Sequence, residues 1–218
     1  INKEYSEEND ITVVQLNYTF DGETKIEGYP GEFNEFFHKL SKSKTFPTTS
    51  QPAVGSFMKA YEKSLIDYDE ILVLPFSSKL SGTFNSACMA KKMVDKNRIR
   101  VIDTKQAVGN LKFLIEDAVM MIKKGKKMEE IIQNINAQKE KMEIYLTVDT
   151  LEYLRRGGRL SGIQSAIGTV LNIKPIIELK NGQLQLLENV RGKKKALNKI
   201  LDKVPAHAKR ISISHIFN

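Results

Sequence analysis

The chain has 218 residues, of which 41% are hydrophobic and 28% are charged. That is enough for one sizeable core or two smaller ones, and no apolar run approaches the roughly 20 residues that a membrane helix needs. The formal net charge is +8, and the single cysteine, Cys88, excludes an intramolecular disulfide and predicts a reducing, cytoplasmic location.

The first part of the chain predicts a strand, a turn and two helices. Residues 11–16 are rich in β-formers and predict the strand, residues 18–20 continue it, and Asp21-Gly22 is a typical turn pair. Pro30 opens a segment in which aromatic residues recur at helical spacing, and Pro52 can occupy the first turn of a second helix.

Between residues 71 and 148 the patterns of strand and helix alternate. The predicted strands are residues 71–76, 98–102 and 144–148, and the predicted helices are residues 83–94, 111–122 and 128–141. This alternation is typical of βαβ units with parallel strands, and strands with few polar residues suit a sheet covered on both faces.

The pattern changes after Arg159. Residues 161–171 predict a helix of small residues. Asn181-Gly182 lies between two alternating runs, which is a strong signal for a two-residue hairpin and therefore for antiparallel strands. A helix over residues 193–204 and a last strand over residues 210–216 complete the prediction.

Two segments rich in hydroxyl groups each lead into a predicted helix. Residues 77–83 (SSKLSGT) follow a predicted strand, where open α/β sheets bind ligands. Ser81 is a good helix N-cap, Gly82 lets the backbone approach a ligand, and the free N–H groups there favour an anion. Residues 48–52 (TTSQP) offer similar groups. Taken alone, each segment is more typical of an ordinary helix cap than of a binding site.

A third segment, residues 155–162, places three arginines around two glycines. Such a cluster suits carboxylates and phosphates, but it is equally typical of a structural turn with solvated arginines. The three histidines show no metal-ligand spacing, and Asp103 at a strand end is more typical of a structural cap than of a catalytic carboxylate. We therefore predict neither a metal site nor a catalytic centre.

Four blocks taken together resemble the DegV family. In order they are TSQPAVGSFMKAYEK (49–63), SSKLSGTFNSA (77–87), VIDT (101–104) and DTLEYLRRGGRLSG (149–162), followed by IKPII (173–177). Their shared order makes the resemblance far more specific than any one block. One block departs, because residues 107–112 read AVGNLK where the family usually has a small-residue run of the type S-M-G-x-G.

The resemblance implies a non-catalytic carrier that holds one long-chain fatty acid, such as palmitate or oleate, with its tail in an apolar tunnel between two parts. The family's carboxylate-binding threonine falls on Thr49 and its serine on Ser81. In the FakB group the acyl chain is presented to a fatty acid kinase, which makes an acyl phosphate, and the arginine implicated in that transfer falls on Arg191. No cofactor is implied, and we expect a transient contact with a membrane surface.

The resemblance also gives the expected fold class, α/β with a DegV-like two-subdomain fold. Residues 66–160 are expected to form a parallel-sheet subdomain whose first strand precedes residue 1. Residues 1–65 and 161–218 are expected to form a second subdomain with an antiparallel sheet, truncated at its C-terminus. Two alternatives stay open: a lipid hydrolase or transferase that uses Ser81, for which no motif places a base, and a basic nucleic-acid-binding protein, although the basic residues are scattered.

Overall fold

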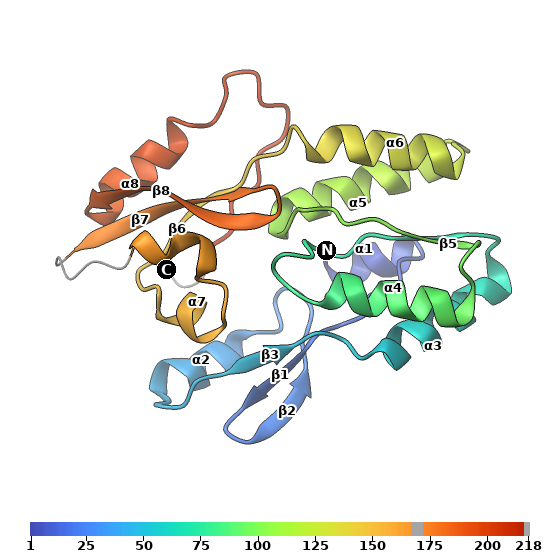
Figure 1. The fold of residues 1–218 in the computed structure, drawn as a ribbon, viewed down its shortest axis with the longest axis horizontal. Coiled ribbons are helices and arrows are strands. Elements are labelled where there is room, and N and C mark those ends of the chain that lie inside the picture. The colour runs from blue at the N-terminus through green and yellow to red at the C-terminus, as the bar shows by residue number, and fades with distance from the viewer. Residues whose placement is uncertain (167–171, 216–218) are drawn as a thin grey trace. The chain divides into compact units, whose positions relative to one another are not determined.

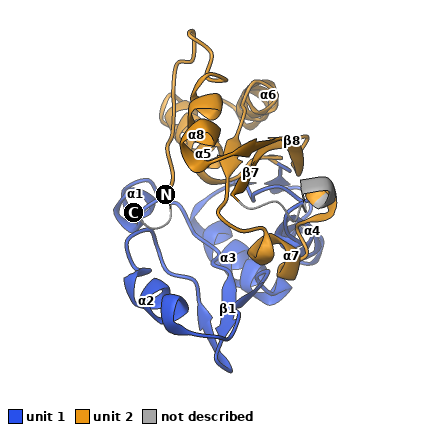
Figure 2. Ribbon diagram, turned by 90° about the vertical axis from the view of Figure 1, so that its left-hand side faces the viewer, with its two compact units in different colours: residues 1–103 blue, residues 104–218 orange. Residues whose placement is uncertain are grey.

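The computed structural model describes residues 1–166 and 172–215 (Figure 1). The chain divides into two compact units, Ile1–Asp103 and Thr104–Asn218, which Figure 2 colours blue and orange. Each unit has its own helices, strands and buried residues. None of the helices in the described part of the chain has the length and apolar character needed to cross a membrane.

The first unit combines a small antiparallel sheet with a parallel pair of strands. In chain order its elements are α1 (Lys3–Glu8), β1 (Asn17–Phe20), β2 (Glu23–Ile26), α2 (Asn34–Lys42), β3 (Thr48–Ser50), α3 (Val54–Asp67), β4 (Ile71–Val73), α4 (Thr83–Val94) and β5 (Ile99–Val101). Strands β2, β1 and β3 form the antiparallel sheet in that order, and β4 pairs with β5 in parallel.

The β1–β2 hairpin follows from its turn residues. Asp21 and Gly22 have φ values of 51° and 81°, which are the left-handed values that a two-residue hairpin turn requires. This turn fixes the pairing at residues 17–20 with 23–26, so residues 11–16 lie outside the ladder. The predicted turn is confirmed, and the predicted strand is confirmed over residues 18–20 but is wrong over residues 11–16.

The parallel pair is covered by α3 and α4. Phe57 and Tyr61 of α3 and Ala87 of α4 are buried together with Ile99 of β5. The β4–α4–β5 unit is the parallel βαβ arrangement that the alternating pattern predicts, and α4 has the predicted bounds. This connection brings the carboxyl ends of both strands and the N-terminus of α4 to the same edge of the pair.

The second unit is built from an antiparallel sheet and helices. Its elements are α5 (Val108–Lys123), α6 (Met128–Lys139), β6 (Tyr145–Thr147), α7 (Glu152–Arg156), the 3-10 helix η1 (Ser161–Ala166), β7 (Ile173–Lys180), β8 (Gln183–Arg191) and α8 (Lys193–Leu201). The strands lie in the order β6-β7-β8. The β7–β8 hairpin turns at Asn181 and Gly182, whose φ values are 50° and 79°, as predicted.

The two faces of this sheet bury different partners. On one face Ile177 packs with Leu160 and Ile163, and on the other face Ile176 and Val190 pack with residues of α8. Side chains alternate between the faces along a strand, so neighbouring isoleucines serve both clusters. The sheet is therefore covered on both faces by parts of its own unit.

Two further predictions differ from the structure. Strand β6 pairs antiparallel with β7, not with a parallel neighbour. Its Leu146 lies opposite Ile177, and both side chains pack in the same cluster. Residues 210–215 form no strand, and Arg210 instead bonds to Asp117 at 2.6 Å. Parts of the predicted helix over residues 161–171 and of the predicted last strand fall on residues 167–171 and 216, which lie outside the described residues.

The fold class is confirmed, since the chain combines helices with a parallel strand pair and with antiparallel sheets. The predicted subdomains, residues 66–160 and residues 1–65 with 161–218, each draw on parts of both compact units. That grouping stays a prediction.

Candidate functional site

Ser81 lies at the start of helix α4. The N-cap residue is Gly82, and no side-chain hydrogen bond caps the helix at that position. Ser81 precedes it, and its Oγ accepts a hydrogen bond from the Thr83 backbone N–H at 3.3 Å and lies 2.9 Å from Thr83 Oγ1. Sequence reasoning placed the N-cap one position too early, but the Ser81 hydroxyl does lie at a helix N-terminus, where N–H groups and the helix dipole favour an anion.

The carboxyl ends of the two parallel strands are tied together by Asp103. The backbone N–H of Ser78 donates to Asp103 Oδ1 at 3.1 Å, and Ser78 Oγ donates to Oδ2 at 2.5 Å. These bonds hold the segment after β4 against the end of β5. Asp103 therefore has the structural role that its position at a strand end suggested.

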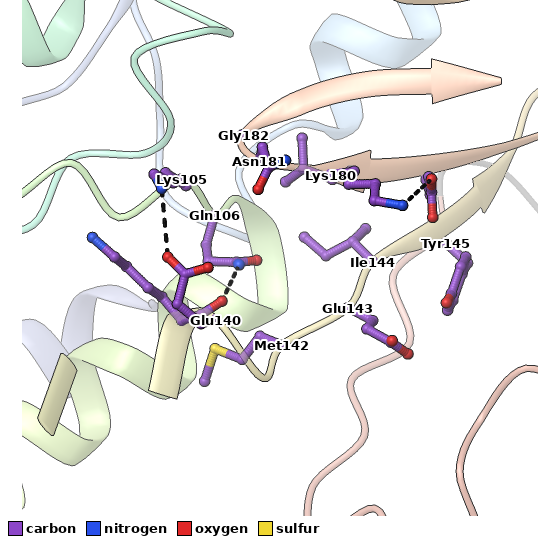
Figure 3. A pocket seen from close by; sticks show the side chains of 13 residues that line it. Lys105, Gln106, Glu140, Met142, Glu143, Ile144, Tyr145, Lys180, Asn181 and Gly182 are labelled. Atoms are coloured by element: carbon purple, nitrogen blue, oxygen red, sulfur yellow. Dashed lines mark hydrogen bonds and ion pairs between the residues drawn. The ribbon is translucent and has the colours of Figure 1, made fainter. Parts of the chain in front are cut away.

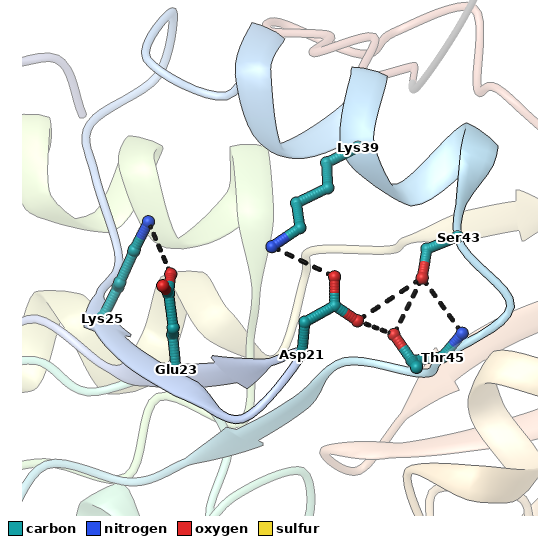
Figure 4. A network of polar contacts seen from close by, with 6 residues as sticks. All are labelled: Asp21, Glu23, Lys25, Lys39, Ser43 and Thr45. Atoms are coloured by element: carbon teal, nitrogen blue, oxygen red, sulfur yellow. Dashed lines mark hydrogen bonds and ion pairs between the residues drawn. The ribbon is translucent and has the colours of Figure 1, made fainter.

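Thr49 lies on strand β3 and is exposed. The loop before this strand is anchored by Asp21, whose carboxylate accepts hydrogen bonds from the hydroxyls of Thr45 and Ser43 and forms an ion pair with Lys39 at 3.0 Å (Figure 4). The Thr45 hydrogen bond and then Lys39 lower the pKa of Asp21 below its ordinary value. The network joins the β1–β2 turn, helix α2 and the loop that leads to Thr49.

Gln51 connects the two predicted binding segments. Its Nε2 donates to Ser86 Oγ in the first turns of α4 at 3.0 Å, and its amide lies over the α-carbon of Gly82. The segment that carries Thr49 and the segment that carries Ser81 therefore meet within the first unit. Sequence reasoning gave Gln51 no role, although it stands two residues after Thr49 in the quoted T-S-Q-P motif.

Arg191 lies in the second unit, as the exposed last residue of β8, opposite Ile173 of β7. The adjacent pair, Val190 opposite Lys174, faces α8, so by strand alternation Arg191 points to the other face of the sheet. On the α8 side, Lys174 and Lys193 form ion pairs with Asp149 at 2.8 and 3.3 Å. Arg191 is thus separate from this lysine cluster.

The arginine-rich turn is partly neutralised by its own helix. Arg155 donates to both carboxylate oxygens of Glu152 at 2.9 and 2.7 Å, and Arg156 donates to Oε1 at 2.5 Å. Hydrogen bonds from Arg155 and then Arg156 lower the pKa of Glu152 to about 2. Gly157 is the C-cap of α7. These contacts favour the structural interpretation of the turn over an anion site.

The block that departs from the family opens helix α5. Val108, the first helical residue, has a φ of 40°, a region that β-branched residues rarely occupy. Asn110, which stands at a glycine position of the family pattern, donates through Nδ2 to Gln106 Oε1 at 2.9 Å and to the Glu143 carbonyl at 3.1 Å. The asparagine therefore fixes this segment to the loop before β6.

A small cavity of about 240 Å³ lies in the second unit (Figure 3). Its lining is largely polar: Lys105, Gln106, Lys139, Glu140, Met142, Glu143, Ile144, Tyr145, Glu178, Leu179, Lys180, Asn181 and Gly182. Lys105 is 3.4 Å from Glu140, and Lys180 is 3.8 Å from Glu178. A charged lining does not suit an alkyl chain, so we do not assign the acyl chain to this cavity.

In residues 1–166 and 172–215, no three His, Cys, Asp or Glu side chains come together to hold a metal ion. His38 is exposed, and its Nε2 lies 2.9 Å from Lys42 Nζ. The hydrogen bonds of the Ser81 side chain in this part of the chain go to Thr83, which cannot act as a general base.

Comparison with known proteins decides the family. The model for uncharacterised proteins of the DegV family matches residues 1–217. The chain belongs to the DegV family. A DegV domain-containing protein of Caldanaerobacter subterraneus subsp. tengcongensis is 38% identical over 192 residues, which are 88% of this chain and 68% of that protein.

Solved DegV structures share the fold. A fatty-acid-binding DegV protein from Thermus thermophilus is 32% identical, with a TM-score of 0.84 over 93% of this chain and 72% of that one. A stearic-acid-binding protein from Eubacterium ventriosum is 30% identical, with a TM-score of 0.81 over 93% of this chain and 71% of that one. Both neighbours bind fatty acids.

Proposed function

We propose that this DegV protein binds one long-chain fatty acid, such as palmitate or oleate, and holds its carboxylate at Thr49 and Ser81. The observation that carries the proposal is the meeting of the two hydroxyl segments at the N-terminus of α4, joined by Gln51. Its similarity to solved fatty-acid-binding proteins of the same fold supports the choice of ligand.

The chemistry of this region suits a carboxylate. Ser81 and Thr49 each offer a hydroxyl donor, and α4 presents N–H groups without a side-chain cap at Gly82. A hydrogen bond to a charged group contributes about 1.5–3 kcal/mol, and an anion at a helix N-terminus gains about 0.3–1 kcal/mol. The site needs no lysine and no metal to hold the ligand.

The alkyl tail supplies most of the affinity. Burying a sixteen-carbon tail gains about 0.8 kcal/mol per methylene, roughly 12 kcal/mol in all. Association and chain ordering cost on the order of 4–15 kcal/mol. Tight binding therefore requires a preformed, dry tunnel as well as a satisfied carboxylate, which is why we propose an apolar tunnel for the tail.

We further propose that the protein is a carrier in the cytoplasm, with transient contact to a membrane surface, and presents the carboxylate to a fatty acid kinase. Arg191 is exposed at the end of β8, where a guanidinium can stabilise phosphate charge or dock an acidic partner surface. Arg191→Ala should leave fatty-acid affinity within about threefold, less than the tenfold change that about 1.4 kcal/mol represents. Acyl phosphate formation with a cognate kinase and ATP should fall strongly, and equal turnover by both proteins would refute the role.

Mass spectrometry of an organic extract tests the binding proposal. The protein, purified from a bacterial host, should carry fatty acid in an amount comparable to its own. Extracts with no more fatty acid than those of an unrelated protein purified in parallel would contradict the proposal. Ester turnover in the same preparation would favour the hydrolase alternative, and a salt-dependent shift with DNA would favour the nucleic-acid alternative.

A further inference from the structure

We infer that Gln51 is a positioning residue of the carboxylate site: its side-chain amide locks the strand that carries Thr49 onto the N-terminus of α4, and residue 82 is a glycine to make room for that amide. The inference rests on the proposed function, in which Thr49 and Ser81 hold the ligand. The inference gives Gln51 a role that acts through the position of Thr49 and the N-terminus of α4, not through a contact of its own with the ligand.

The space above Gly82 is taken by the Gln51 amide. A β-carbon at this position would overlap Gln51 Oε1 and would lie 2.6 Å from Cδ and 2.9 Å from Nε2. Gly82 has φ −72° and ψ 3°, a conformation open to any residue, so backbone strain does not explain the glycine. The space that the Gln51 amide occupies explains why a side chain at position 82 would not fit.

Both ends of the Gln51 link are held in place. Gln51 Nε2 donates to Ser86 Oγ at 3.0 Å, and Ser86 is buried, with 2% of its surface exposed. On the other side Gln51 is followed by Pro52, which is also buried and whose ring fixes φ. The amide is therefore a short strut between two fixed segments.

The charge of the side chain at position 51 also matters. Because the Gln51 amide lies over the N-cap residue of α4, it lies close to the helix N-terminus that would hold an anion. A neutral amide leaves that region free for the carboxylate of a ligand. A glutamate of the same shape would place a fixed negative charge there and compete with the ligand for the helix N-terminus.

The test compares a long-chain fatty acid with the fatty alcohol of the same length. Gln51→Glu keeps the size of the side chain, and its carboxylate can accept from the Ser86 hydroxyl. We expect at least about a tenfold loss of affinity for the acid and a change within about threefold for the alcohol. A merely structural role would weaken both ligands together, and that result, or unchanged acid affinity, would overturn the inference.

A double-mutant cycle tests the strut without any ligand. Gly82→Ala must displace the Gln51 amide, and Gln51→Ala removes it, so each variant should have a lower melting temperature than wild type. The double variant should be no less stable than Gly82→Ala, because the added β-carbon then meets no amide. Additive losses would overturn the geometric claim. If the cycle shows coupling but the wild-type protein binds acid no better than alcohol, the proposed carboxylate site fails while the strut stands.

Discussion

Gly82 in the first unit and Gly162 in the second both follow a serine at the start of a helical segment, yet they make room for different things. At Gly82 the neighbour is the Gln51 side chain, which links the end of β3 to α4. At Gly162 the neighbour is the backbone carbonyl of Leu184 on β8, which cannot move without the hairpin. Gly82 makes room for a side-chain link in the proposed binding region, whereas Gly162 makes room for the packing of backbone on backbone.

The largest loss of stability is expected at Gly162, where an added β-carbon would meet the backbone of β8. In Gly162→Ala the new β-carbon would overlap the Leu184 oxygen and lie 3.1 Å from its carbonyl carbon, so η1 and β8 must separate. Overpacking of this kind costs about 1–3 kcal/mol, and we expect a loss of at least that size in the free energy of unfolding. Urea denaturation measures it.

Gly55 offers the matched control. It lies in α3, and nothing in the described chain comes within 4 Å of the position of a β-carbon there. Gly55→Ala should therefore stabilise the protein by about 0.5–1 kcal/mol, because alanine loses less backbone entropy in a helix. A Gly162→Ala variant as stable as Gly55→Ala would remove the contrast between the two glycines.

Local sequence signals predicted much of the fold. The Asp21-Gly22 and Asn181-Gly182 turns and helix α4 depend on nearby residues, and the structure has them where predicted. The pairing of β6 with β7 depends on contacts across about thirty residues, which a strand pattern does not specify. The N-terminal helix α1, with Asn2 as its cap, has only six residues and buries Ser6, so no apolar periodicity marks it in the sequence.

The candidate site was only partly readable in the sequence. Hydroxyl-rich segments before helices are common, and Thr49 and Ser81 gained meaning only through the family resemblance. The contact between Gln51 and Gly82 joins positions 31 residues apart, and no local sequence pattern predicts a contact at that separation. The sequence left the arginine-rich turn open between an anion site and a structural turn, because the ion pairs of Glu152 depend on side-chain geometry.

A second prediction concerns a buried polar group in the second unit. Among the described residues, Thr147 Oγ1 on β6 is a buried hydroxyl without a hydrogen-bond partner. Replacing it by a methyl group removes an unsatisfied polar group, so Thr147→Val should raise the free energy of unfolding by about 1 kcal/mol. Thr104→Val is the matched control: Thr104 Oγ1 accepts from the Gln106 N–H at 3.2 Å, and its loss should destabilise by about 1 kcal/mol. Equal effects of the two changes would contradict the assignment.

The smallest effect is expected at the network that anchors the loop before Thr49. The pKa of Asp21 is lowered from 3.8, so its contribution to stability is fully present above about pH 3.8 and is lost as the pH falls through its lower value in the folded state. Asp21→Asn should therefore lower the melting temperature at pH 6, and its difference from wild type should shrink toward pH 2–3. Thr45→Val should have little further effect in the Asp21→Asn background. A constant difference across this pH range would show that the ionised carboxylate is not the stabilising group.

The central claim is that the hydroxyls of Thr49 and Ser81 in the first unit hold a fatty-acid carboxylate. Displacement of a fluorescent fatty acid tests it most directly when wild type is compared with the Thr49→Ala/Ser81→Ala double variant, with circular dichroism as the control for folding. Each lost hydrogen bond to the charged group is worth about 1.5–3 kcal/mol, so affinity should fall by at least about tenfold. Unchanged affinity in a folded double variant would contradict the account.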